Sequence, residues 1–315
     1  MILVAGGTGT LGEPLVRMLA AHDHQVRVLT RDHHKANDLR AVGVDVVIGD
    51  VRAPAAVAAA VAGCTTVISA VHGFVGPRGV NPATIDRDAN RTLISAAVNA
   101  GVGHLLLVSV YGAGPDHPMS LHRMKYAAEQ SLVDSGLDWT IVRPVPFIET
   151  WTAVIGAHLL DQNKALVFGR GDNPINMVSV RDAALAIDRA LADPASRGQV
   201  IDVTGPACLT FRQIAEQLLA TTAPSGKISQ IPLPILRIMS VLTQPVAPSF
   251  ARQAQAAVVM NTTDMTATTT RPDLACVDRG ATTLDQLLQG SIGPVAASRL
   301  VTGPSDSSEG QVNGS

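Results

Sequence analysis

The sequence predicts an α/β fold built on a doubly wound parallel sheet, with a smaller lobe towards the C-terminus. In the first half of the chain, short β-branched runs alternate with alanine-rich stretches of helical periodicity. The runs are apolar throughout rather than alternating, which is typical of strands covered by helices on both faces. Strand–helix alternation of this kind predicts βαβ units and a parallel sheet.

The expected strands of this half are Ile2–Ala5, Val26–Thr30, Val44–Gly49, Thr66–Ser69, Leu105–Ser109 and Trp139–Val142. The expected helices are Leu11–Ala21, Ala53–Ala62, Ala83–Ala100 and Met119–Ser135. After Pro144 the pattern loosens, and we expect helices at Ala184–Leu191 and Phe211–Ala220 and strands at Ala165–Phe168 and Gln199–Val203. The predicted organisation is a core over residues 1–150, a lobe over 151–289 intertwined with that core as a single domain, and a disordered tail over 290–315.

The composition excludes several classes of protein. Charged residues make up only 16% of the chain, and the net charge is −2, which gives no electrostatic footprint for nucleic acid or an anionic membrane. Cys64, Cys208 and Cys276 are far apart and form no CxxC pair, so neither a zinc motif nor a disulfide framework is expected. A strand that begins at Ile2 leaves no room for a secretion signal. We therefore expect a cytoplasmic protein.

Two further sequence features bear on whether the chain has a membrane-spanning segment or a metal site. The apolar stretch Ile228–Val246 is interrupted by three prolines and by Arg237, so it is too broken to span a membrane. It is either an apolar lid, an interface helix or ordinary core. The histidine pairs His22/His24 and His33/His34 have no second cluster of ligands near them, so no metal site is predicted.

A glycine-rich loop directly follows the first strand and opens the first helix. It contains GxGxxG at the start of a βαβ unit, which is the context in which this motif binds a dinucleotide. We assign Gly7 to the tight turn, Gly9 to the close approach of a pyrophosphate, and Gly12 to close helix–strand packing. Unpaired N–H groups at the helix start then favour the phosphates. The expected cofactor loop is Gly6, Gly7, Thr8, Gly9, Thr10, Leu11 and Gly12, and the core is expected to be an NAD(P)-binding Rossmann fold.

The end of the second strand selects between the two dinucleotides. Arg31 offers a planar fork for a 2′-phosphate, with Lys35 in support, whereas Asp32 is an alternative partner for a ribose hydroxyl. We favour NADP(H), with NAD(H) possible. An exposed Arg–Asp pair of no function is the plain alternative.

Two more strand ends face the same crevice. Asp50 and Val51 close the third strand, where we expect them to meet the adenine. Ser69, Ala70 and Val71 close the fourth, where small residues let the cofactor pass. Ordinary turn chemistry is the alternative at both places.

Together these features resemble an atypical short-chain dehydrogenase/reductase, over about residues 1–205. The resemblance is to the NmrA-like branch, which includes NAD(P)H-dependent quinone reductases. It rests on GGTGTLG, Asp86-x-x-x-Asn90, Ser109, Lys125-x-x-x-Glu129, Val142-Arg143-Pro144 and the segment from Asn176 to Asp182. It implies that Lys125 holds the nicotinamide ribose and that the segment from Pro144 and Val145 borders the cofactor. Tyr111 follows Ser109 by two residues and can point into the same crevice, so the predicted catalytic residues are Lys125, Tyr111 and Ser109.

Ordinary enzymes of the superfamily carry a Tyr-x-x-x-Lys pair, and this chain does not. The position four residues before Lys125 is Leu121, and neither Tyr111 nor Tyr126 has a lysine four residues after it. Loss of a positioned acid lowers the rate of carbonyl reduction by a factor of roughly 10²–10⁴. A quinone, azo compound or activated enone delocalises the incoming charge and takes its proton from water, so reduction of these electron-poor acceptors is predicted.

Substitute proton donors are Tyr111, His117, His122 and Lys125 itself with a lowered pKa. A packed tyrosine, two exposed histidines and a lysine that only binds ribose are the alternatives. Glu129 stands one helical turn after Lys125 and is a possible i,i+4 partner.

The expected acceptor pocket is apolar and lies in the second, substrate lobe. The side chains proposed for it are Phe147, Trp151, Met177, Met239 and Phe250, with ordinary core as the alternative. The competing function is a non-catalytic sensor of NAD(P)(H) that binds a protein partner. The third hypothesis for the function is an isomerase or lyase that uses the nicotinamide transiently.

Overall fold

The computed structural model describes residues 1–76, 79–267 and 276–290, so the tail expected beyond Gly290 lies outside the described residues. Its main sheet has eight parallel strands in the order β12-β9-β6-β5-β4-β1-β2-β3. They are β1 (Ile2–Ala5), β2 (Val26–Thr30), β3 (Asp45–Ile48), β4 (Thr66–Ser69), β5 (His104–Val108), β6 (Asp138–Pro144), β9 (Gln199–Thr204) and β12 (Cys276–Arg279). The strand order reverses between β1 and β4, which is the switch point where ligands bind in such sheets.

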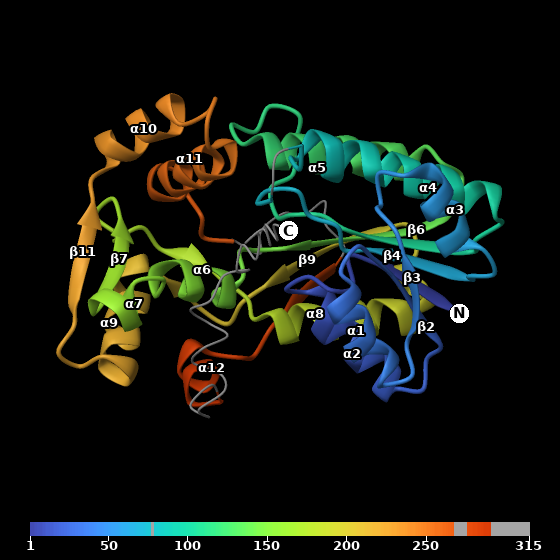
Figure 1. Ribbon diagram of the computed structural model, residues 1–315, viewed down its shortest axis with the longest axis horizontal. Coiled ribbons are helices and arrows are strands. Elements are labelled where there is room, and N and C mark those ends of the chain that lie inside the picture. The colour runs from blue at the N-terminus through green and yellow to red at the C-terminus, as the bar shows by residue number, and fades with distance from the viewer. Residues whose placement is uncertain (77–78, 268–275, 291–315) are drawn as a thin grey trace, which may run out of the picture.

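Helices cover both faces of this sheet (Figure 1). One face is covered by α1 (Gly12–Ala21), α2 (His33–Arg40) and α8 (Val180–Ala192). The other is covered by α3 (Pro54–Val61), α4 (Asn90–Asn99) and α5 (Ser120–Val133), with a π-helical turn at Ala83–Ala89 leading into α4. Each face has its own apolar core, one around Leu15, Leu19 and Ile187 and the other around Leu3, Leu93 and Leu132. The predicted doubly wound sheet is confirmed.

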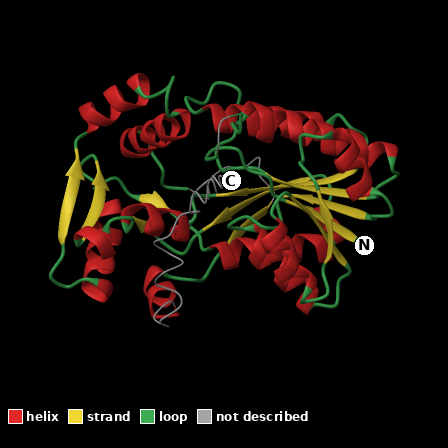
Figure 2. Cartoon of the chain, in the orientation of Figure 1, coloured by secondary structure: helices red, strands yellow, loops and turns green. Residues whose placement is uncertain are grey.

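A second lobe is built from a small parallel sheet and short helices (Figure 2). Strands β7 (Lys164–Phe168) and β11 (Lys227–Ile231) pair in parallel, and β8 (Ile175–Asn176) pairs antiparallel with β10 (Cys208–Leu209). The remaining elements of the lobe are α6 (Ile148–Ile155), α7 (Leu159–Gln162), α9 (Phe211–Thr222), α10 (Leu233–Leu242), α11 (Pro248–Thr262) and α12 (Leu284–Gly290). The 3₁₀ turn Pro194–Ser196 belongs to the main sheet, where it joins α8 to β9. The chain leaves this lobe for the main sheet through α8 and β9 and again through β12, so the two parts are interleaved.

Two local departures from the expected elements have simple causes. Helix α2 is polar and has no apolar stripe, but Asp32 caps it by accepting hydrogen bonds from the amides of His34 and Lys35. The expected helix Ala83–Ala100 begins with the π-helical turn before α4. In the described part of the chain, no helix is both long and apolar enough to cross a bilayer.

Candidate cofactor and acceptor site

The glycine loop lies between β1 and α1 at the switch point. Gly6 adopts a left-handed φ of 86°, so the tight turn belongs to Gly6 rather than to Gly7 as expected. A Cβ on Gly7 would lie 2.8 Å from the Val28 side chain, and one on Gly12 would collide with the Gly6 carbonyl oxygen. At Gly9 the nearest atom to an added Cβ is the Gly6 oxygen, at 3.3 Å. Gly9 is therefore the least crowded glycine of the motif, although an added Cβ would still require the Gly6 oxygen to shift slightly.

The loop presents polar backbone to solvent. Thr8 is half-buried, Gly9 and Thr10 are exposed, and Leu11 is buried. The Gly9 amide bonds to Gly6 O at 3.0 Å, but no group in the described part of the chain accepts a hydrogen bond from the amides of Thr10, Leu11 or Gly12. These three N–H groups stand at the start of α1, where the helix dipole favours an anion. This arrangement can hold a pyrophosphate.

Arg31 and Asp32 take different roles at the end of β2. The Asp32 carboxylate accepts from His34 N at 3.0 Å and Lys35 N at 3.1 Å, so it is the cap of α2. The Arg31 side chain is 55% exposed, and its Nη1 lies 3.6 Å from Asp50 Oδ2. Lys35 Nζ donates to Thr8 O at 2.9 Å, so a second cation stands beside the loop.

Asp50 is engaged with a residue that the sequence analysis did not identify. Arg52 Nη2 donates to Asp50 Oδ2 at 2.6 Å and Arg52 Nε donates to Oδ1 at 3.0 Å. This side-chain hydrogen bonding lowers the pKa of Asp50 to about 2. Val51 is half-buried against the core on the α3 side. The end of β3 therefore carries a fixed carboxylate flanked by two arginines.

The end of β4 is held by a side-chain hydrogen bond to the start of α4. Ser69 is fully buried, and its hydroxyl bonds to the Asn90 side chain at 2.5 Å, while Asn90 Nδ2 donates to Asp86 O at 2.7 Å. Ala70 lies against the glycine loop, because a Cβ on Gly6 would be 2.6 Å from Ala70 O. Ser69 thus supports the strand from within, and the backbone of Ala70 and Val71 borders the loop.

Lys125 is buried beneath the carboxyl ends of β4 and β5. It is 2% exposed, and its Nζ donates to Val71 O at 2.9 Å and to Val108 O at 2.8 Å. It also forms an ion pair with Asp86 Oδ1 at 3.2 Å. The ammonium group thus donates two hydrogen bonds to backbone carbonyls and balances the charge of a buried carboxylate. In this arrangement Lys125 joins two strand ends.

Asp86 is completely buried, and its surroundings favour the charged carboxylate that pairs with Lys125. Its Oδ2 accepts from Gly73 N at 3.0 Å, and the half-exposed His72 ring lies 3.7 Å from Oδ1. Burial opposes the charged carboxylate, but Lys125, His72 and the Gly73 amide keep the pKa of Asp86 below its ordinary value. The pair therefore fixes the path of the chain from Val71 to Gly73.

Ser109, Tyr111, Pro144 and Val145 gather at the neighbouring strand ends. Ser109 N donates to Val142 O at 2.7 Å and Tyr111 N to Pro144 O at 2.9 Å, which joins the segment after β5 to β6. Val145 is buried and its amide bonds to Val203 O in β9. The Ser109 hydroxyl is buried and has no hydrogen-bond partner among the described residues. The half-buried Tyr111 packs against the core on the α1 side.

His117 and His122 are not two exposed side chains, which was the alternative to a role for them as proton donors. Their rings stack with centroids 3.7 Å apart. Burial lowers the pKa of His122 to about 3, and it also lowers the pKa of His117. Both imidazoles are neutral near pH 7, so neither is an imidazolium proton donor.

Glu129 does not pair with Lys125. It is 1% exposed and accepts from Arg143, with Nε at 2.9 Å from Oε1 and Nη2 at 2.6 Å from Oε2. This bidentate pair links α5 to β6. The i,i+4 contact considered from the sequence is therefore wrong.

The five apolar residues expected around the acceptor do not form one pocket. Trp151 belongs to the core of the second lobe, where its ring centroid is 4.7 Å from that of Phe211, and Met177 is fully buried in the same core. Met239 packs between α10 and α11, while Phe250 is exposed. Only Phe147 lies against the core that also holds Val145 and Tyr111.

A separate apolar cluster joins the segment after β4 to α5 and α11. Phe74, which follows β4, packs with Met119 at the start of α5 and with Ala256 and Val259 of α11. Arg252 of α11 anchors this segment by donating to Phe74 O at 2.8 Å. The hydrogen bond from Arg252 to Phe74 joins residues 178 positions apart, so no local sequence pattern indicates these contacts.

A family model described as NAD(P)H-binding matches residues 6–194, which include the glycine loop, Lys125 and α8. The chain belongs to this NAD(P)H-binding family. The resemblance to atypical short-chain dehydrogenases/reductases is confirmed, and the fold is that of Rossmann-type NAD(P)-binding proteins.

Three curated relatives illustrate the range of this NAD(P)H-binding family. An NAD(P)H azoreductase of Xenophilus azovorans is 34% identical over 70% of this chain and 73% of its own length. A (4-alkanoyl-5-oxo-2,5-dihydrofuran-3-yl)methyl phosphate reductase of Streptomyces griseus is 30% identical over 86% of this chain and 95% of its own. The photosystem II assembly factor Ycf39 of a Synechocystis strain is 28% identical over 77% of this chain and 74% of its own.

Two solved structures have the same fold. The Citrobacter triphenylmethane reductase in complex with NADP(H) superposes with a TM-score of 0.71, at 20% identity, over 92% of this chain and 99% of that one. The Escherichia coli NADPH-dependent quinone oxidoreductase in complex with NADPH gives a TM-score of 0.66, at 25% identity, over 84% of this chain and 92% of that one.

Glu149 is a second group in this NAD(P)H-binding protein that the sequence analysis missed. It follows the Pro144–Phe147 segment, and both of its carboxylate oxygens accept from Val180 N, at 2.9 and 3.0 Å, at the start of α8. Burial raises its pKa from 4.5 to about 7 despite these hydrogen bonds.

This shift predicts a pH-dependent stability. A carboxyl group whose folded pKa is raised stabilises the fold below its unfolded pKa and loses that contribution as pH rises through the folded value. The free energy of unfolding should therefore fall between pH 4.5 and about 7 on account of Glu149. In Glu149→Gln, urea titrations across this range should show a shallower decline, because the amide oxygen still accepts from Val180 N. The exposed Glu216→Gln is the control, and equal slopes in the two variants would contradict the assignment.

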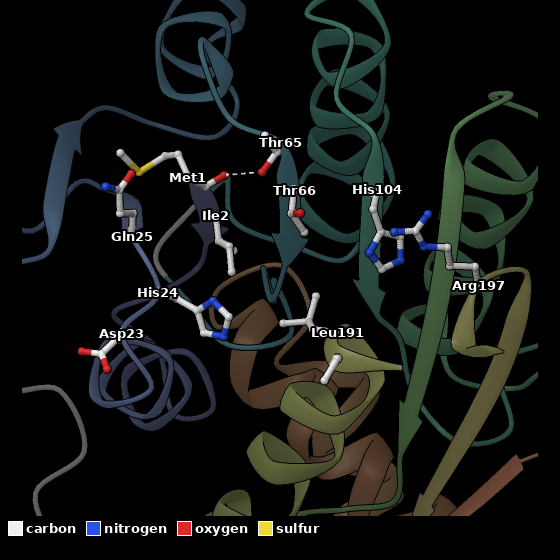
Figure 3. A pocket seen from close by; sticks show the side chains of 11 residues that line it. Met1, Ile2, Asp23, His24, Gln25, Thr65, Thr66, His104, Leu191 and Arg197 are labelled. Carbon is white, nitrogen blue, oxygen red and sulfur yellow. Dashed lines mark hydrogen bonds between the residues drawn. The ribbon is translucent and has the colours of Figure 1, made fainter. Parts of the chain in front are cut away.

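A surface hollow of about 390 Å³ lies at the opposite, amino edge of the sheet (Figure 3). It is lined by residues that begin β1, β4 and β5, together with Arg197, and includes His104, which bonds to Thr140 Oγ1 at 2.9 Å. This hollow is separate from the glycine loop. Among residues 1–76, 79–267 and 276–290, no three His, Cys, Asp or Glu side chains are grouped to hold a metal ion.

Proposed function

We propose that this protein transfers hydride from NADPH to an electron-poor apolar acceptor of the quinone, azo or activated-enone class. The observation that carries the proposal is the combination of a dinucleotide loop with Leu121, buried, at the position of the usual tyrosine acid. The neutral His117 and His122 do not replace that acid. Relatives named as an azoreductase and as a reductase of a dihydrofuranone phosphate support the same acceptor classes.

The cofactor supplies hydride from the nicotinamide, and the chain's residues position it. The amides of Thr10, Leu11 and Gly12 bind the pyrophosphate. Lys125 acts as a positioning residue, since it fixes Val71 and Val108 where the nicotinamide half passes. We assign the Ser109 hydroxyl to a hydrogen bond with the nicotinamide or the acceptor, and Tyr111 to the adjoining wall.

The proton balance of the reaction requires no acid from the protein. One NADPH and one proton convert a quinone to a hydroquinone and NADP⁺. The developing charge is spread over the acceptor's conjugated system, so water supplies the proton. A ketone without such conjugation lacks this route and should react poorly.

Arg31 provides the test of cofactor choice. It is exposed beside the loop, whereas Asp32 is used as a helix cap, and this supports NADP(H) over NAD(H). In Arg31→Ala the Kd for NADPH should rise about 10–100-fold, which corresponds to one lost charge-assisted contact. The Kd for NADH should change less than about threefold. Calorimetry of both cofactors with Arg40→Ala as control decides the point, and equal losses would reject a 2′-phosphate site at Arg31.

The activity itself is tested by NADPH oxidation in the presence of acceptors of graded reduction potential. Soluble quinones, an azo dye and an activated enone should be turned over, and a simple ketone should not. Tight NADPH binding without turnover of any acceptor would contradict the reductase and favour the sensor alternative, for which the assembly factor among the relatives gives support. The proposed partner is thus a small apolar molecule, and the proposed location is the cytoplasm.

A further inference from the structure

Helix α10 is apolar apart from Arg237 and Ser240, yet the described chain covers only one of its sides. Leu233, Leu236 and Met239 pack towards Ala254 and Ala257 of α11. The opposite side and the turn that follows are exposed by between 42% and 85%, at Ile235, Ile238, Val241, Leu242, Val246 and Phe250. A helix without a polar face normally has both sides covered. We call these six residues the α10 patch.

The α10 patch lies at an outer end of the molecule, away from the main sheet (Figure 1). It is formed by α10, the turn after it and the first turn of α11, whereas Ala256 and Val259 of α11 pack with Phe74 and Met119. An exposed apolar surface of this kind indicates an interaction site rather than scattered single side chains.

The charges around the α10 patch select one kind of partner. Residues 217–263 contain no Asp or Glu, but include Lys227, Arg237 and Arg252. Arg252 is engaged with Phe74, whereas no ion pair in the described structure involves Arg237 or Lys227. β7, the strand paired with β11, also lacks a carboxylate. Arg237 stands on α10 itself, whereas Lys227 begins β11 at the end of that strand away from α10. The net charge of −2 gives the whole chain no attraction to an anionic surface, but an exposed apolar face with a cation beside it and no acid in its own segment is complementary to a bilayer that contains anionic lipid.

We propose that the α10 patch docks this protein in the plane of an anionic membrane surface. At ten residues α10 is about 15 Å long, half of the roughly 30 Å hydrocarbon core, so it lies in the interface and does not span it. Its apolar side chains enter the acyl boundary while Arg237, which flanks the patch, reaches the headgroups. A symmetric pairing with a second copy would instead bring two Arg237 side chains onto one small face without an acid between them.

Vesicle flotation of the full chain tests this proposal without reference to catalysis. The protein should float with vesicles of phosphatidylcholine and phosphatidylglycerol and much less with phosphatidylcholine alone. Ile238→Glu/Leu242→Glu should reduce the partition coefficient at least ~tenfold, because several buried CH₂ groups are lost at each site. Arg237→Gln should reduce it about fivefold on the mixed vesicles only.

The matched control is Val98→Glu/Val133→Glu, which makes the same charge change at two exposed valines of α4 and α5. Its flotation should equal that of the wild type, and thermal melts of both double variants should show that each is folded. Absence of flotation by the wild type, or equal flotation of the two double variants, would overturn the proposal. So would a dimer in light scattering that requires Ile238 and Leu242 and excludes vesicles, since the occupant would then be a second copy.

Discussion

Lys125→Met is expected to lower the free energy of unfolding by about 3–5 kcal/mol, because it leaves the buried carboxylate of Asp86 without its ion-pair partner. The same substitution also removes the two donors that join Val71 and Val108. Urea denaturation measures the loss. The exposed Lys164→Met serves as control and should change the free energy of unfolding by less than about 0.5 kcal/mol.

The pH dependence of this loss identifies its cause. With Lys125 gone, burial acts on Asp86 with less opposition and its pKa should rise above the ordinary value. Stability is then present below the unfolded pKa and lost as pH rises through the folded one, so the defect should be smaller in acid than at neutral pH. Lys125→Met/Asp86→Asn, which removes both charges, should recover a substantial part of the loss. A defect that is independent of pH and of Asp86 would show that the ion pair is not its cause.

This role of Lys125 was only partly accessible from the sequence. The lysine itself is identified by the Lys125-x-x-x-Glu129 motif on which the family resemblance rests. Its partners Val71, Val108 and Asp86, however, come from three other segments of the chain. The same reason explains Ser69, which small-residue chemistry assigned to the cofactor path and which bonds to Asn90 instead. Side-chain partners across elements depend on the packing of the sheet and helices, which local patterns do not encode.

The glycine loop and the sheet were predicted more fully because their signals are local. An apolar strand, closely spaced glycines and a helix start within one βαβ unit determine the backbone that holds a phosphate. The residues around the acceptor were predicted poorly. The sequence cannot distinguish apolar residues that line a pocket from those that fill a core, and Trp151 and Met177 belong to a core. The contacts between Phe74 and α11 depend on the second lobe folding back over β4.

Gly9→Ala is expected to raise the Kd for NADPH about 10–100-fold while leaving the fold stable. An added methyl group would meet only the Gly6 carbonyl oxygen, at 3.3 Å, so a small shift accommodates it in the protein. The same methyl group stands on the exposed rim of the loop, where it would keep a pyrophosphate away from the amides of Thr10 and Leu11. Loss of one charge-assisted hydrogen bond costs about 1.5–3 kcal/mol, which is the basis of the expected change.

Gly12→Ala provides the contrast, because its Cβ collides with the Gly6 carbonyl oxygen inside the turn. That variant should lose both thermal stability and NADPH affinity, whereas Gly9→Ala should lose affinity alone. Melting temperatures and calorimetric titration of NADPH, measured on the same preparations, separate the two effects. Because the amides of Thr10, Leu11 and Gly12 are the only anion-binding groups we assign to the pyrophosphate, unchanged affinity in Gly9→Ala would place the cofactor elsewhere on the sheet edge and with it the acceptor.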